Sequence, residues 1–180
     1  MKIAVIGYSG CGKSTLAGFL GEHYDICVLH LDRVHWLPGW KERAQSEKQE
    51  IVRSFLDDHG AWVIDGNYSN LFFERRLFEA DQIVLMRFCR LTCLWRAVKR
   101  YFAYRGRTRE SMTEGCPEKI DLEFIWWILY KGRSRKHRDN FTRVPAQYPA
   151  KTIVIKNQRQ LTAYMRSVEN DAPEADQKKG

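Results

Sequence analysis

Eight residues near the amino terminus have the types and the spacing that phosphate chemistry requires. Residues 7–14 read Gly-Tyr-Ser-Gly-Cys-Gly-Lys-Ser, the pattern Gly-x-x-x-x-Gly-Lys-Ser of a phosphate-binding loop. Glycines permit positive φ angles and let backbone N–H groups approach phosphate oxygens. The lysine adds a positive charge for β- and γ-phosphates, and the serine hydroxyl suits Mg²⁺, which prefers oxygen ligands. The motif therefore predicts a nucleoside triphosphate site.

The residues on either side of this motif support the same interpretation. An apolar run at residues 3–6 precedes it, and residues 14–23 follow with apolar side chains at helical spacing. A loop between a buried parallel strand and a helix directs its amides and the helix N-terminus at one anion. We expect phosphate contacts from Gly7, Ser9, Gly10, Cys11, Gly12, Lys13, Ser14 and Thr15, with Ser14 also bound to Mg²⁺.

Short apolar segments alternate with helical patterns along the rest of the chain. This alternation predicts an α/β three-layer fold, a five-stranded parallel sheet with helices on both faces. One domain over residues 1–168 and a disordered tail over 169–180 are expected. The predicted strands are 2–6, 26–31, 61–65, 82–87 and 151–156, and the predicted helices are 14–23, 42–59, 70–80, 91–105, 120–143 and 158–168.

Two carboxylates follow predicted strands at the sheet edge where ligands of such folds bind. Asp32 ends the second strand and Asp65 ends the third. Either residue can simply cap a turn. Beside a phosphate loop, however, Asp65 is placed to hold Mg²⁺ through water, and Asp32 is placed to orient or deprotonate an acceptor.

Composition narrows the class of protein. The chain has 180 residues, of which 44% are apolar, so it suits a globular domain. No apolar run is long enough to span a membrane or to serve as a signal peptide, so we expect a cytoplasmic protein with no membrane partner. The five cysteines are scattered, which favours reduced thiols and supports neither a disulfide framework nor a zinc site.

The positive charge is concentrated in the middle of the chain. The net charge is +8, and residues 87–143 hold 15 basic and 6 acidic side chains. Arg96 and Arg100 lie four apart on a predicted helix, where a solvated helix face is the alternative interpretation. Such a segment can line a phosphoryl-transfer site or bind nucleic acid, because any polyanion is attracted to it.

Six motifs together resemble the adenylate-kinase-related P-loop proteins labelled DNA topology modulation proteins (FlaR-like). They lie at residues 7–14, 30–32, 36–40, 65–68, 104–109 and 114–119. The resemblance covers residues 1 to about 156. It implies an adenylate-kinase-like fold, ATP on the loop, an acceptor site over the second and third strands, and a basic lid at about 105–119.

The resemblance also implies roles for particular residues. In related kinases, arginines from the helix before the lid and the helix after it contact the transferring phosphoryl group. Here the first set is Arg96 and Arg100, and the second is Arg133, Arg135 and Arg138, with Arg107 and Arg109 in the lid turn. Asn157, after the fifth strand, corresponds to a contact with adenine. The adenylate kinase segment Asp-Gly-Phe-Pro-Arg matches only Asp65 and Gly66, so its phosphate-binding arginine is absent. Arg75 or Arg76 can substitute for it or can be solvated helix residues.

The acceptor and the oligomeric state stay open at this stage. Asn67, Tyr68 and the aromatic loop residues His35, Trp36 and Trp40 can contact an acceptor or pack locally. The apolar segment 124–130 indicates a buried helix or a subunit contact. The favoured hypothesis is a Mg²⁺- and ATP-dependent kinase for a small acceptor, and the alternative is a nucleotide-regulated DNA-binding protein.

Overall fold

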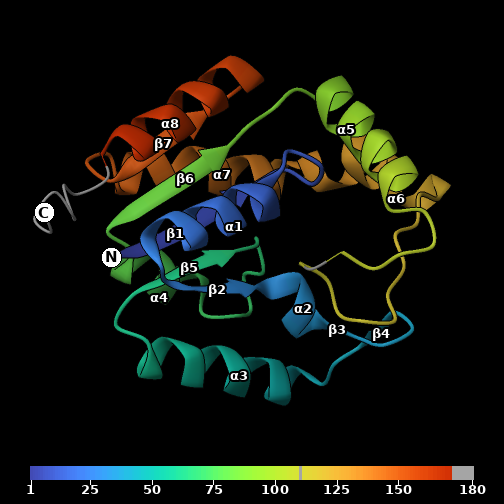
Figure 1. The fold of residues 1–180 in the computed structure, drawn as a ribbon, viewed down its shortest axis with the longest axis horizontal. Helices are drawn as coiled ribbons and strands as arrows, with labels where there is room; N and C mark the ends of the chain where they lie inside the picture. The colour runs from blue at the N-terminus through green and yellow to red at the C-terminus, as the bar shows by residue number, and fades with distance from the viewer. Residues whose placement is uncertain (110, 172–180) are drawn as a thin grey trace, which may run out of the picture.

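A five-stranded parallel sheet forms the centre of the molecule (Figure 1). The computed structural model describes residues 1–109 and 111–171. The sheet order is β2-β5-β1-β6-β7, which confirms the predicted α/β fold with five parallel strands. The strands are β1 (Lys2–Gly7), β2 (Cys27–His30), β5 (Trp62–Asp65), β6 (Gln82–Met86) and β7 (Thr152–Ile155).

Helices cover both faces of this sheet. In Figure 1, α1 and α8 lie in front of the sheet and α7 lies behind it. The strands between these layers are buried on both faces, and Ile3 to Ile6 of β1 are fully inaccessible to solvent. The helices include α1 (Lys13–Tyr24), α3 (Gln45–Asp58), α4 (Phe73–Glu79), α5 (Arg90–Ala103), α7 (Arg135–Gln147) and α8 (Gln158–Asn170).

Three short elements after β2 were missed by the sequence interpretation. The chain enters the short helix α2 (Leu31–His35) and then an antiparallel hairpin of β3 (Trp36–Leu37) and β4 (Lys41–Glu42). The hairpin turn places Gly39 at φ 74° and Trp40 at φ 62°. Elements of two to five residues are too short to show a hydrophobic period, so the pattern could not reveal them.

The helix predicted over residues 120–143 is wrong as one continuous element. The structure divides it into α6 (Leu122–Leu129), a 3-10 helix η1 (Lys131–Arg133) and α7. Tyr130 leaves the helical region at φ −132° and ψ −64°. Gly132 favours the break because glycine is a weak helix former and because a Cβ there would lie 2.9 Å from Trp127 Nε1.

The C-terminal helix extends beyond its predicted end. We expected a tail from residue 169, but α8 continues to Asn170. The rest of the predicted tail, residues 172–180, lies outside the described residues. Within the described part of the chain, no helix combines the length and apolar content that crossing a bilayer requires.

Candidate functional site

The loop of residues 7–14 connects β1 to α1 at the carboxyl edge of the sheet. Gly10 has a φ of 78°, and a Cβ there would lie 2.5 Å from the backbone oxygen of Cys93. Gly12 has a φ of 95° and occupies the N-cap position of α1, where no described side chain caps the helix. The first-turn amides of α1 are therefore left to a ligand or to water, as phosphate binding requires.

Ser14 and Asp65 meet at this edge. The Ser14 hydroxyl donates a hydrogen bond of 2.8 Å to Asp65 Oδ2. The contact follows from the sheet order, because β5 lies beside β1 and Val5 pairs with Asp65. Lys13 begins α1 and donates through Nζ to the Tyr8 backbone oxygen at 3.2 Å. The structure thus brings together three residues that the sequence singled out.

His30 also contacts Asp65, and the sequence interpretation missed it. Its Nδ1 atom lies 2.5 Å from Asp65 Oδ1. The register of β2 on β5 sets this pair opposite each other. Asp65 is only 4% exposed, so its two oxygens are held between a hydroxyl and an imidazole in a nearly dry environment. The sequence signals for His30 were its place near the end of a predicted strand and its position in the motif at residues 30–32, but no role was assigned to it.

The donor set at this position suits Mg²⁺. No group of three or more His, Cys, Asp or Glu side chains within residues 1–109 and 111–171 is placed to hold a metal ion. Mg²⁺, however, commonly binds through one or two protein oxygens, with water and substrate phosphates completing its shell. Ser14 Oγ and Asp65 Oδ2 fit that requirement, because both are oxygen ligands beside the phosphate loop.

Asp32 and Tyr68 form a second polar pair, which lines the same cleft as Ser14 and Asp65. The Tyr68 hydroxyl donates a hydrogen bond of 2.8 Å to Asp32 Oδ1. Burial, reinforced by the Asp32 carboxylate, raises the pKa of Tyr68 far above its ordinary value. Tyr68 therefore stays protonated and occupies one oxygen of Asp32, while Oδ2 accepts no hydrogen bond from residues 1–109 and 111–171.

Aromatic side chains extend from this pair toward the hairpin. The His35 ring lies 4.7 Å from the Tyr68 ring and 4.6 Å from that of Trp36, and the Trp36 and Trp40 rings are 5.5 Å apart. We call His35, Trp36, Trp40 and Tyr68 the aromatic wall. Burial and the nearby Lys48 ammonium lower the pKa of His35, which favours its neutral form.

The predicted lid segment packs on the hairpin. Thr113 Oγ1 donates to the Trp36 backbone oxygen at 2.6 Å, and Cys116 Sγ donates to the Leu37 backbone oxygen at 3.2 Å. Within the segment, Glu118 accepts hydrogen bonds of 2.7 Å from both Arg100 and Arg109. Burial and repulsion from Arg109 lower the pKa of Arg100. Arg100 thus connects α5 to the lid segment.

One continuous cleft of about 1530 Å³ joins these groups. Its lining includes Lys13, Ser14 and Arg96 beside the loop, Asp32 and Tyr68 in the middle, and Trp40 and Lys119 at the lid. Sites for one drug-sized ligand usually measure about 300 to 1000 Å³. The cleft is therefore large enough for a nucleotide and a small acceptor together.

Arg96 and Arg133 contact the phosphate loop from different sides. Arg96 Nη1 donates to the Cys11 backbone oxygen, and Arg96 lines the cleft. Arg133 does not line the cleft. Its Nη2 donates to the Phe88 backbone oxygen at 2.8 Å, and its guanidinium carbon lies 3.8 Å from the Tyr8 ring centroid. Arg133 therefore supports the loop in this arrangement, and its contact with a phosphoryl group stays a prediction.

Asn157 and Asn67 both make local contacts. Asn157 caps α8 by accepting from the Gln160 amide at 3.0 Å, and the neighbouring Gln158, rather than Asn157, lines the cleft. Contact of Asn157 with a base stays a prediction. Asn67 accepts from the Gly7 amide at 3.0 Å and donates to the Gly7 oxygen at 2.5 Å. Asn67 thus fixes the start of the phosphate loop.

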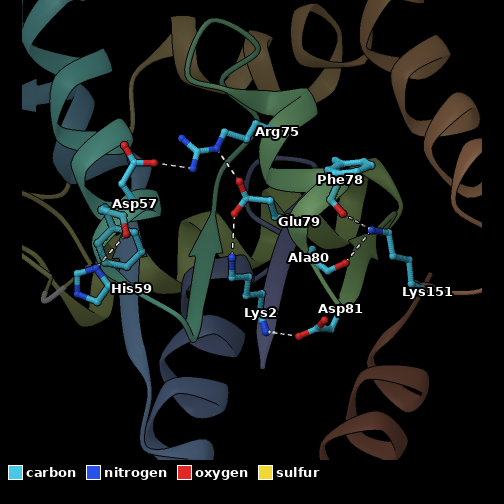
Figure 2. Close-up of polar contacts among 10 residues, drawn as sticks. Lys2, Asp57, His59, Arg75, Phe78, Glu79, Ala80, Asp81 and Lys151 are labelled. Atoms are coloured by element: carbon cyan, nitrogen blue, oxygen red, sulfur yellow. Dashed lines mark hydrogen bonds and ion pairs between the residues drawn. The ribbon is translucent and has the colours of Figure 1, made fainter.

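Arg75 and Arg76, the two candidates to replace the missing phosphate-binding arginine, do not line the cleft. Figure 2 shows Arg75 between Asp57 and Glu79, with N–O distances of 2.6 Å to each. Arg76 is fully buried and donates to the backbone oxygens of Leu71, Gly66 and Tyr68. Their donors are used within the protein, so neither replaces the missing phosphate-binding arginine in this arrangement.

Comparisons with known proteins show the fold at low sequence identity. No family model matches the chain, and no curated protein matches it. TT1252 from Thermus thermophilus is 15% identical with a TM-score of 0.53, covering 95% of this chain and 97% of that chain. An uncharacterized protein from Eubacterium ventriosum ATCC 27560 is 16% identical with a TM-score of 0.50, covering 94% and 98%.

Small-molecule kinases also occur among the similar structures. Deoxyadenosine kinase from M. mycoides with bound dATP is 16% identical with a TM-score of 0.49, covering 94% of this chain and 100% of that chain. The likenesses to TT1252 and to the Eubacterium ventriosum protein show an α/β fold, and in this chain the loop between β1 and α1 carries the motif of residues 7–14. Neither a family model nor a curated protein supports the FlaR-like resemblance, so that resemblance stays a prediction.

Proposed function

We propose that this protein is an ATP-dependent kinase that transfers the γ-phosphoryl group to a hydroxyl of a small acceptor. The observation that carries the proposal is the placement of two polar centres in one cleft. Lys13, Ser14 and Asp65 lie at the phosphate loop, and the Asp32 and Tyr68 pair faces the same space. Phosphoryl transfer depends mainly on such positioning and on charge stabilisation.

The donor half of the proposal assigns the triphosphate to the loop. Loop amides and the Lys13 ammonium bind the β- and γ-phosphates. Ser14 and Asp65 are the residues that would hold Mg²⁺, which neutralises phosphate charge when bound. Arg96 lies beside Cys11 and adds planar donors where charge develops on the phosphoryl oxygens. Adenine is the expected base.

The acceptor half assigns the hydroxyl to Asp32. The carboxylate accepts the acceptor proton, the acceptor oxygen forms a bond to the γ-phosphorus, and the bond to the β–γ bridging oxygen breaks to release ADP. Tyr68 fixes Asp32 through the hydrogen bond at Oδ1, which leaves Oδ2 to face the acceptor. The aromatic wall offers flat surfaces for a ring or a sugar face.

The test is a panel of nucleosides, nucleotides and hydroxylated metabolites incubated with Mg²⁺ and ATP labelled at the γ-phosphate. We expect label on at least one acceptor. Asp32→Asn should slow that transfer about 100-fold or more while ATP still binds. The matched control is Asp25→Asn, which changes an exposed residue at the end of α1. Equal transfer rates for Asp32→Asn and the wild type would contradict the role of Asp32.

The nucleic-acid alternative has less support. No comparison favours it, and the basic residues Arg100 and Arg109 are paired with Glu118 rather than displayed for a phosphate backbone. A DNA titration against salt distinguishes the two functions. Binding that weakens steeply with salt and shows no sequence preference is incidental. Sequence-selective binding at physiological salt would reverse the ranking.

A further inference from the structure

The helices α5 and α6 expose an apolar surface that the proposed reaction does not use. Six large side chains on this surface are between 50% and 85% exposed. We call it the α5–α6 face. It consists of Leu91, Trp95 and Phe102 on α5, Leu122 and Trp126 on α6, and Tyr130 directly after α6.

The spacing of these residues makes two continuous stripes. Leu122, Trp126 and Tyr130 are four residues apart, so they follow one side of the helix, and the Trp126 and Tyr130 rings are 4.4 Å apart. The opposite sides of the helices face inward, where Cys93 and Ile128 are buried. Exposed apolar groups at regular helical spacing are typical of a contact surface rather than of isolated surface residues.

The two helices lie antiparallel beside each other at the end of the molecule opposite the N-terminus (Figure 1). The Arg90 guanidinium, at the start of α5, lies 5.6 Å from the Tyr130 ring beyond the end of α6. Arg100, near the end of α5, lies 6.0 Å from the Phe124 ring near the start of α6. The stripes therefore run along one two-helix unit.

Charges at the two ends of the α6 stripe have opposite signs. The exposed carboxylate of Glu123 follows Leu122 at the rim of the cleft, which it also lines, whereas the exposed Arg90 and Lys131 flank Tyr130. Within residues 1–109 and 111–171, no ion pair involves Glu123 or Arg90. The stripe is thus apolar along its length, acidic at one end and basic at the other.

We propose that the α5–α6 face binds a second copy of this chain in a symmetric dimer. A twofold axis near Trp126 sets α6 antiparallel to the same helix of the partner, so Leu122 of each copy meets Tyr130 of the other. The same operation brings Glu123 of each copy beside Arg90 of the other. Aromatic and aliphatic anchors surrounded by complementary charges are characteristic of protein interfaces.

The first measurement is the mass of the full chain in solution by light scattering over a range of concentrations. We expect twice the chain mass of 21.3 kDa. Trp126→Glu should weaken dimerisation about 100-fold or more, because it places two carboxylates near the axis. The control is Phe78→Glu, since Phe78 is 75% exposed on α4, outside the α5–α6 face. A monomer at every concentration would overturn the proposal.

Charge exchange tests the pairing itself. Glu123→Arg and Arg90→Glu should each weaken dimerisation about tenfold, and the double variant should restore it, because the exchanged charges again meet across the axis. Circular dichroism checks that each variant is folded. If the loss of dimerisation free energy in the double variant equals the sum of the losses in the two single variants, this arrangement is excluded. Binding of the monomer to anionic vesicles through Trp126 would assign the face to lipid instead.

Discussion

The imidazole of His30 lies with Nδ1 2.5 Å from Oδ1 of Asp65, while the other oxygen of that carboxylate accepts from Ser14. The contact fixes the direction in which Asp65 presents Oδ2 to the phosphate loop. Residues that orient a ligating carboxylate commonly affect metal affinity as strongly as some direct ligands do. His30 is therefore expected to position Asp65 for Mg²⁺·ATP.

His30→Ala should reduce the gain in ATP affinity that Mg²⁺ provides by about tenfold, because Asp65 loses one of its two fixed contacts. Calorimetric titrations of ATP with Mg²⁺ and with EDTA measure this gain. His59→Ala is the matched control. His59, labelled in Figure 2, does not line the cleft, and its ring contacts the backbone oxygen of Phe55. Removing the His59 ring should leave the Mg²⁺ dependence of ATP binding unchanged. An unchanged Mg²⁺ dependence in His30→Ala would contradict the assignment.

Asn67→Ala should destabilise the fold by about 2 kcal/mol. The variant loses both hydrogen bonds to Gly7 and leaves the buried backbone N–H of Gly7 without its Asn67 acceptor. Urea denaturation measures the change in the free energy of unfolding. Asn70→Ala, at an exposed position nearby, should stay within about 0.5 kcal/mol of the wild type. Equal stabilities for the two variants would show that the Asn67 contacts do not hold the loop.

The sheet and the loop could be predicted because their signals are local and periodic. Buried strands such as β1 are short apolar runs, and residues 7–14 form a contiguous motif. The meeting of Ser14 with Asp65 could also be expected, because both follow strands of a parallel sheet. These features require only the order of elements along the chain.

The rest of the site depends on contacts that a linear pattern does not contain. His30 reaches Asp65 through the register of β2 on β5, and Glu118 joins Arg100 to Arg109 through the path of the lid segment. Arg133 lies in η1, which interrupts the expected continuous helix, and its guanidinium packs on the Tyr8 ring of the loop. Spacing along one assumed helix could not anticipate that change.

Tyr68→Phe should lower kcat/KM for the acceptor about tenfold and leave ATP affinity unchanged, because the hydroxyl contacts Asp32 and not the phosphate loop. Steady-state kinetics with the acceptor identified in the labelled-ATP experiment measure kcat/KM for the acceptor separately from the dependence on ATP. Tyr148→Phe is the control, because Tyr148 is not among the residues that line the cleft. A loss of ATP affinity in Tyr68→Phe would place Tyr68 at the donor end instead.

Glu79 should stabilise the fold in a pH-dependent way. Burial acts to raise its pKa, but hydrogen bonds from Lys2 and Arg75 outweigh burial and lower the pKa of Glu79 below the ordinary 4.5. Its stabilisation is then fully present above about pH 4.5 and is lost as the pH falls through the lower folded-state pKa. Figure 2 shows both partners.

Glu79→Gln tests this linkage by urea denaturation at several pH values. The variant should be about 1 kcal/mol less stable than the wild type at neutral pH, and the difference should shrink below about pH 4.5. Glu22→Gln, which changes an exposed position on α1, serves as the control. A difference that grows as the pH falls would have the wrong sign.

The phosphate loop is the feature on which the proposed function depends, and calorimetry of ATP binding with Mg²⁺ tests it most directly. The wild type should bind one ATP per chain. Lys13→Ala should stay folded and bind about 10 to 100 times more weakly, because one charge-assisted contact with phosphate is lost. Absence of binding to the wild type, or equal binding to the two proteins, would contradict the proposed triphosphate site.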